Sequence, residues 1–168
     1  MNLNNFISKN FLIEYNLPEN LENIEKFEGN WEIVIPDSYK NWLQSSSSTL
    51  FNSNSKTLSE NVNIGERIKL YSIKMIEYNL KERRPFRQEA KIIFESEDNM
   101  LQIGKTDYGQ SIFIGIKGSE EGKIFMFEDM NDSDIIENED GFFLFPSFKI
   151  SNTFEDFLEL IFAISEPY

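Results

Sequence analysis

The chain has 168 residues, of which 29 are acidic and 16 basic, so its formal net charge is −13, and it contains neither histidine nor cysteine. These absences remove the commonest general base, the commonest transition-metal ligand, every thiol mechanism and all disulfides. What remains for catalysis is carboxylate chemistry, lysine chemistry, or a hard cation held by Asp and Glu.

The acidic balance indicates which partners suit the surface. It repels nucleic acid and anionic lipid, so we expect neither nucleic acid nor membrane as a partner. It attracts a basic protein and speeds that encounter at low salt, and a nuclease, whose own substrate-binding face is positive, is one such protein. The same acidity also keeps a cytoplasmic protein soluble, so charge alone does not decide between these two interpretations.

Residues 1–16 are predicted to form a short N-terminal extension ahead of a single domain that spans residues 17–168. The extension lacks the basic segment and apolar run that are typical of a secretory signal. No stretch approaches the roughly 18 apolar residues of a membrane span. We therefore expect a cytoplasmic protein.

Two helices are predicted in the first part of the domain. Residues 17–28 carry apolar side chains at helical spacing after a proline and an acid, and Gly29 is predicted to end this helix. A second helix is predicted to start at Pro36 and to bury Tyr39 and Trp42.

The next segments are less regular. Residues 44–63 are rich in serine and asparagine and predict a long surface loop within the domain. A strand is expected over 68–71 and a third helix over 73–80. The basic run 81–84 suits the last turn of that helix, which Pro85 is predicted to follow.

The character of the sequence then changes to β. Short apolar segments with short connections predict an antiparallel meander, and the strands that are apolar on both faces should be covered on both sides. A further strand is predicted to be ended, or placed on a sheet edge, by Pro146. The predicted strands are 91–95, 100–104, 111–116, 123–127 and 142–145, with turns at 107–109 and 117–122.

The last predicted helix has the clearest start. Asn152 or Thr153 can serve as its N-cap, because an acid stands three residues further on. An apolar stripe at helical spacing follows and predicts burial of one face. Its members are Phe154, Phe157, Leu158 and Ile161.

Three spaced motifs carry a family resemblance. They are Ile35-Pro36 with Tyr39 and Trp42-Leu43, Ile103-Gly104 with Gly109, and Thr153-Phe154 with Phe157-Leu158. In this order they resemble the SUKH superfamily, the SMI/KNR-like group, over roughly residues 17 to 165. Members often carry Asn-Gly-Gly after the second helix, where this chain has Ser45–Ser48.

The resemblance implies a fold and a class of function. The fold would be α+β, with N-terminal helices, a central mainly antiparallel sheet and a closing C-terminal helix. The group contains many bacterial immunity proteins, which bind and neutralise toxins, and also eukaryotic regulators of cell-wall synthesis. The motif residues themselves are expected to serve the fold, with partner contacts on exposed acids and aromatics.

The densest acidic stretch, 128–140, has several possible roles. Read as a calcium loop that starts at Asp129, it has Asp134 where glycine is expected and Asp140 where glutamate is expected. A solvated acidic loop and a docking surface for a basic toxin are the other interpretations.

A metal-dependent carboxylate hydrolase is a less favoured alternative. Glu95, Glu97 and Asp98 stand beside a predicted strand end and could form a catalytic carboxylate pair, but charged residues in a β-turn explain them more simply. The glycines form no nucleotide-binding loop.

The sequence therefore predicts an immunity protein that occludes the active site of a cognate toxin, with no enzymatic activity, no cofactor and no metal. The alternative is an intracellular regulatory or scaffold module without a toxin partner. The oligomeric state is left open. The residues predicted to contact the partner, all on turns of the predicted sheet, are Asp107, Tyr108, Glu120, Glu121, Glu128, Asp129, Asp132 and Asp134.

Overall fold

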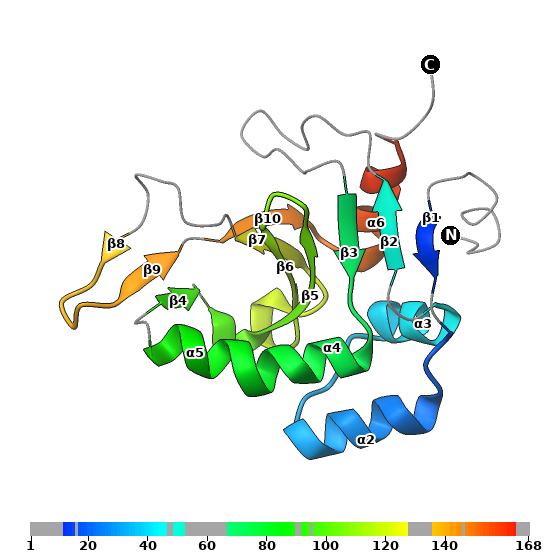
Figure 1. Cartoon of the computed structure of the whole chain (residues 1–168), viewed down its shortest axis with the longest axis horizontal. Coiled ribbons are helices and arrows are strands. Elements are labelled where there is room, and N and C mark those ends of the chain that lie inside the picture. The colour runs from blue at the N-terminus through cyan, green and yellow to red at the C-terminus, as the bar shows by residue number, and fades with distance from the viewer. Residues whose placement is uncertain are drawn as a thin grey trace.

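The computed structural model describes residues 12–15, 17–46, 49–52, 67–89, 92–94, 96–127, 136–145 and 147–163. It confirms the α+β class: helices accompany a seven-stranded sheet in which each neighbouring pair is antiparallel (Figure 1). The strands, in sheet order, are β1 (Leu12–Tyr15), β2 (Thr49–Asn52), β3 (Arg67–Leu70), β5 (Met100–Thr106), β6 (Ser111–Gly115), β7 (Ile124–Phe127) and β10 (Phe148–Ser151).

The helices confirm the predicted order along the chain, including the closing C-terminal helix. They are α2 (Leu21–Trp31), α3 (Asp37–Ser45), α4 (Ile73–Tyr78), α5 (Arg84–Glu89) and α6 (Phe154–Ala163). A π-helical turn, Asn79–Arg83, joins α4 to α5. Among the described residues, no helix has the length and apolar character needed to cross a bilayer.

A second, three-stranded sheet lies beside the main one at the left of Figure 1. Its strands are β4 (Ile92–Phe94), β9 (Phe143–Phe145) and β8 (Ile136–Glu137), with β9 in the centre, parallel to β4 and antiparallel to β8. The segment 91–95 was expected to begin the meander, and this expectation is wrong. The strand before Pro146 was expected to be ended there or placed on a sheet edge; β9 does end at Phe145, but it lies in the centre of its sheet. Short connections favour pairing between neighbours in sequence, whereas β4 pairs with a strand far along the chain.

The N-terminal strands also differ from expectation. Within the predicted extension 1–16, β1 pairs with β2 at the edge of the main sheet. Within the predicted loop 44–63, β2 pairs with β3, so that part of the loop prediction is wrong. Residues 53–63 lie outside the described residues.

Two helix ends differ from the sequence prediction. Helix α2 passes through Gly29 and ends at Trp31, and its C-cap, Glu32, adopts the left-handed conformation with φ of 53°. Pro85 does not follow a helix end, because the π-helical turn leads directly into α5. Pro85 stands in the first turn of α5, where a missing N–H is tolerated.

The core lies on both faces of the sheet, as the apolar strands predicted. On β6, Ile112 and Ile114 belong to a large cluster with the helices, whereas Phe113 points to the other face. That other face holds a smaller cluster, which Phe145 of β9 completes. Its members are Met100, Phe113, Phe125, Phe127 and Phe145.

The motif residues serve the fold. Tyr39 is fully buried, donates a hydrogen bond from its hydroxyl to the Tyr71 carbonyl at 2.9 Å, and packs edge-on against Phe154 at a ring distance of 5.0 Å. Burial raises the pKa of Tyr39 far above its ordinary value. Gly104 faces β3 so closely that a Cβ there would lie 2.5 Å from the Lys69 carbonyl oxygen.

The predicted cap of the last helix is also present. The Asp156 amide donates to Thr153 Oγ1 at 3.0 Å, which is the bond of an N-cap residue. Phe154 and Phe157 lie at the start of α6 and are buried in the large cluster. Helix α6 therefore closes the helix-covered face of the sheet.

Candidate binding surface

Asp107 and Tyr108 occupy the turn between β5 and β6. The Asp107 amide donates to the Arg67 carbonyl at 3.0 Å, and its Oδ1 accepts from the Arg67 amide at 3.3 Å, so the turn is fastened to the start of β3. Thr106 closes the turn by donating its amide to the Gln110 carbonyl at 2.9 Å. Tyr108 is 62% exposed on this anchored turn. An exposed aromatic on a fixed backbone is a suitable anchor for a protein partner.

Glu120 and Glu121 lie in the connection between β6 and β7. Glu120 is within 3.6 Å of the Lys123 ammonium, and its carbonyl oxygen would lie 1.8 Å from a Cβ on Gly115. Only glycine at that position allows the turn to approach the strand so closely. Glu121 is exposed, while its backbone forms a bridge with Gly115.

These two pairs of predicted contact residues lie at opposite ends of β6. A five-residue strand separates them by roughly 15 Å, so a partner must span its length to contact both. The structure thus brings Asp107 close to Tyr108 and Glu120 close to Glu121, but it does not join the pairs. The other predicted contact residues, Glu128, Asp129, Asp132 and Asp134, lie outside the described residues.

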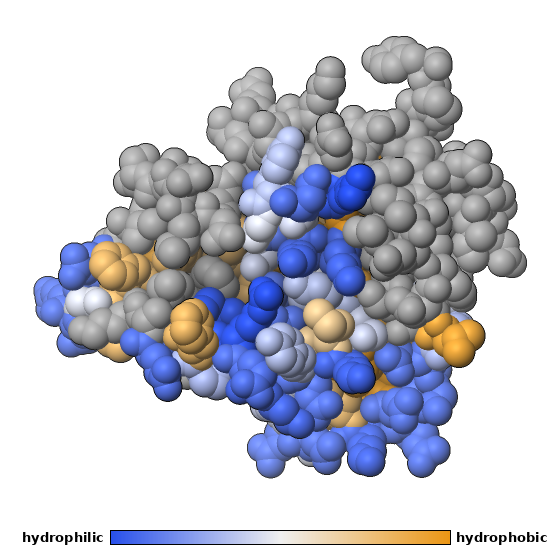
Figure 2. All heavy atoms as spheres, in the orientation of Figure 1, coloured by the Kyte–Doolittle hydropathy of each residue, from blue (hydrophilic) through white to orange (hydrophobic). Residues whose placement is uncertain are grey.

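Three cations that the sequence analysis did not single out form a basic stripe, Arg67, Lys69 and Lys105. Lys69 pairs directly with Lys105 across β3 and β5, so both side chains share one face of the sheet. Ile68 and Leu70 are buried against the helices, which places the stripe on the opposite face. Figure 2 shows hydrophilic side chains gathered over β3 and β5 on this face. Finding the stripe requires the β3–β5 register, which local sequence patterns do not contain.

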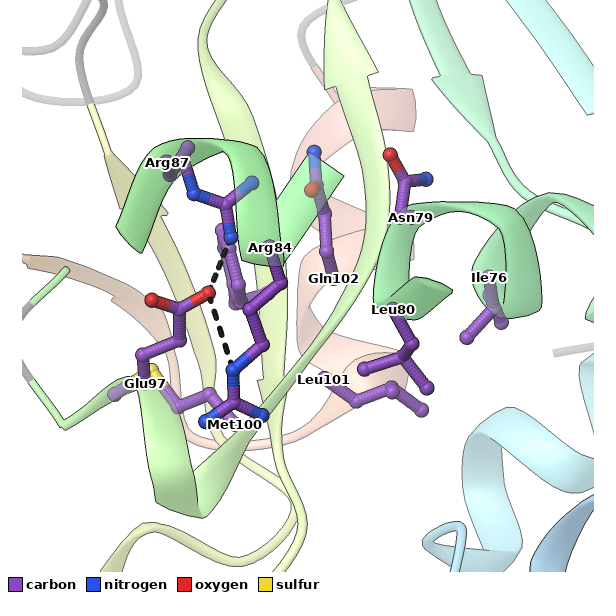
Figure 3. Close-up of a pocket in the computed structure, with 10 residues that line it drawn as sticks. Ile76, Asn79, Leu80, Arg84, Arg87, Glu97, Met100, Leu101 and Gln102 are labelled. Atoms are coloured by element: carbon purple, nitrogen blue, oxygen red, sulfur yellow. Dashed lines mark hydrogen bonds and ion pairs between the residues drawn. The ribbon is translucent and has the colours of Figure 1, made fainter. Parts of the chain in front are cut away.

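A second charge cluster, drawn in Figure 3, is buried beside the π-helical turn. Glu97 is only 8% exposed and forms an ion pair with Arg87, while Arg84 Nε lies 3.9 Å from its Oε1. Arg84 also pairs with the exposed Asp98. Each guanidinium is therefore balanced by a carboxylate. The basic run before Pro85 does not end a helix, because it continues through the π-helical turn into α5, which begins at Arg84.

This cluster replaces the carboxylate pair that the hydrolase alternative requires. Glu97 points toward two arginines, whereas Asp98 is 86% exposed at its side chain. Glu95 lies outside the described residues. The described part of the chain contains no group of three or more acids placed to hold a metal ion. Most of the proposed calcium loop, 129–140, lies outside that part.

A small pocket adjoins the buried ion pairs. Asn79 and Gln102 line it, and within the described residues the Asn79 Oδ1 and Gln102 Oε1 atoms accept no hydrogen bond. Its cavity volume of about 10 Å³ is close to the space that one water needs. The pocket therefore suits a single bridging donor and is far smaller than a substrate site.

A wider, open groove of about 420 Å³ lies between α2 and α4. Its walls carry both signs of charge, with Glu19 and Glu77 beside Lys26 and Lys74. The hydrogen bond from Lys81 lowers the pKa of Glu77. Because its charges are mixed, this groove favours neither an acidic nor a basic partner.

Comparison with known proteins gives one match. A family model described as the SMI1 / KNR4 family (SUKH-1) matches residues 18–160. No curated protein and no solved structure matches the chain. The matched range extends from the residues just before α2 into α6 and therefore includes the β3–β5 surface described above.

Proposed function

The chain belongs to the SMI1 / KNR4 family (SUKH-1), and from this membership we propose that it is an immunity protein that binds a cognate bacterial toxin and occludes its active site. The family is generally one of binding domains without enzymatic activity. The absence of histidine and cysteine from the chain supports binding over catalysis, because the commonest bases and nucleophiles are missing.

Tyr108 is the surface residue that most directly supports the proposed contact with a toxin. Its turn is fixed to β3 through two hydrogen bonds of Asp107, so the ring is presented without a large loss of backbone entropy on binding. Tyrosine is enriched among the residues that dominate interface energies. We propose Tyr108 as the aromatic anchor of the toxin contact.

The predicted acids extend this contact. A standard interface covers about 800 Å² on each partner, which is broad enough to reach both ends of β6. Asp107 at one end and Glu120 and Glu121 at the other are proposed contacts, together with the acids of segment 128–134. The net charge of −13 would speed the approach of a basic toxin at low salt.

The first step of the test is to determine whether the neighbouring gene encodes a toxin domain, and the second is to co-express that domain with the chain. The wild-type chain should restore growth to cells that produce the toxin and should bind the purified toxin domain in a titration. Tyr108→Ala should weaken binding by about tenfold or more, because it removes the anchor. Tyr78→Ala is the matched control, since Tyr78 is 51% exposed on α4, beyond the other end of β3.

Three results would count against parts of the proposal. If the wild-type chain neither binds the toxin domain nor restores growth, the immunity function is wrong. If purification from the native cell then yields a housekeeping complex, the regulatory or scaffold module becomes the better explanation. Equal losses for the two tyrosine variants would remove Tyr108 as the anchor.

A further inference from the structure

One row of residues across four strands changes from core to surface. In register order the row runs Phe127, Ser111, Lys105, Lys69 across β7, β6, β5 and β3. Phe127 is 1% exposed within the cluster that Phe145 completes, Ser111 and Lys69 are half-buried, and Lys105 is exposed. The aromatic half of this sheet face is covered by β9, whereas Arg67 and Lys105 in the basic half are exposed.

The basic half also lacks counter-charges within the described part of the chain. None of the ion pairs formed there includes Arg67, Lys69 or Lys105. Asp107, two residues after Lys105, directs its Oδ1 to the Arg67 amide, and Glu66, which directly precedes Arg67, lies outside the described residues. By contrast, Arg84 and Arg87 are both paired with carboxylates.

The opposition of Lys69 and Lys105 has no benefit for folding. Like charges directly opposite in an antiparallel pair repel each other across a Cβ separation of about 5 Å. Such an arrangement, in a chain with a net charge of −13, is explained if a partner supplies the anions. Arg67 stands next on the same face and adds a guanidinium, which binds carboxylates in a bidentate manner.

We propose that the basic stripe, Arg67, Lys69 and Lys105, is a docking surface for a carboxylate-bearing segment of the protein partner. The proposal rests on the proposed function, since it assigns part of the toxin contact. Tyr108 lies at the end of the stripe and would be covered by the same segment. A nucleic acid is disfavoured because the net charge repels a long polyanion, whereas two or three carboxylates on a protein need only local complementarity.

This local contact is compatible with a toxin that is basic overall. Long-range attraction depends on net charge and sets the association rate, whereas short-range pairing depends on the charges that meet in the complex. At physiological salt, electrostatic interactions are screened over about 8 Å, so the charges of the stripe interact mainly with the groups directly above them.

The test compares two double variants in titrations with the purified toxin domain. Lys69→Glu with Lys105→Glu reverses the stripe, and Lys74→Glu with Lys149→Glu makes the same change in net charge at exposed lysines elsewhere. The first double variant should raise the dissociation constant by about tenfold or more, and the second should raise it by about threefold at most. The single variant Lys105→Glu serves as well if the first double variant does not fold. Equal effects for the two double variants overturn the docking surface while the wild-type affinity still supports immunity.

A second arm tests the stripe even if no toxin binds, a result that would contradict the proposed function itself. The ¹⁵N-labelled full chain is titrated at low salt with a hexaglutamate peptide and, separately, with a ten-nucleotide thymidine strand. Hexaglutamate should shift the amides of 67–69 and 105–108, and the reversed variant should lose these shifts. No shift there, or a stronger response to the thymidine strand, would overturn a protein carboxylate as the ligand.

Discussion

The two halves of one face of the main sheet differ: one is covered and aromatic, and the other is basic. On β6 and β7, Phe113 and Phe127 pack edge-on at a ring distance of 4.9 Å and are covered by β9. On β3 and β5, the same face carries the basic stripe. The sheet is continuous across these strands, so the difference comes from coverage: a strand distant in sequence covers the aromatic half, whereas Arg67 and Lys105 in the other half are exposed. In the covered half, apolar side chains are buried as stability requires. In the other half, two lysines stand opposite each other, which stability disfavours, and there we propose that a partner docks.

The largest expected effect is on the covered half. Phe113→Ala removes a ring that is 1% exposed and its contact with Phe127, so the free energy of unfolding should fall by about 3–5 kcal/mol. Urea denaturation measures this loss. The control is Tyr108→Ala, an exposed aromatic on the uncovered side, which should change stability by less than about 0.5 kcal/mol. Similar losses in both variants would contradict the division into a covered and an uncovered half.

A smaller effect is expected at the buried ion cluster of Glu97, Arg84 and Arg87. Glu97→Gln leaves Arg84 and Arg87 near each other without their shared carboxylate, and stability should fall by about 1–3 kcal/mol. The loss is below that of a fully buried pair because the Arg84 side chain is 29% exposed. Asp98→Asn is the matched control, since Asp98 also pairs with Arg84 but is 86% exposed, and it should cost less than about 1 kcal/mol. A larger loss for Asp98 than for Glu97 would show that burial does not decide which pair matters.

The smallest effect should have the opposite sign. Lys105→Glu converts a like-charge cross-strand pair with Lys69 into an opposite-charge pair, so stability should rise by about 0.2–1 kcal/mol. Lys149→Glu, at an exposed side chain on β10, should give no comparable gain. Thermal unfolding of both variants at low and high salt measures the difference, which salt should reduce. A destabilised Lys105→Glu would mean that the two lysines do not repel each other in the folded chain.

Local sequence patterns predicted the elements whose signals are local. Helix α6 was found from its cap at Thr153 and its apolar stripe, and the β5–β6–β7 meander from short apolar segments joined by turns. The α+β class and the family followed from the three spaced motifs, which the family match confirms. Gly29 was misread because a glycine can remain inside a helix when a later residue, here Glu32, adopts the left-handed conformation.

The features that were missed depend on contacts between distant segments. The parallel pairing of β4 with β9 leaves no periodic signal in either strand, and the π-helical turn before Pro85 is a local accommodation within a helix. The basic stripe appears only when β3 and β5 are placed in register, because Lys69 and Lys105 are distant in sequence. Of the predicted contact residues, the sequence identified the exposed turn of Tyr108 but not the cations beside it.

The most direct test of the account is the crystal structure of the chain bound to the cognate toxin domain that we propose as its partner. The account predicts that Tyr108 is buried in the interface and that toxin carboxylates lie within about 4 Å of the Lys69 or Lys105 ammonium groups. A complex in which the β3–β5 face remains open to solvent, with the toxin seated on the helices instead, would contradict it.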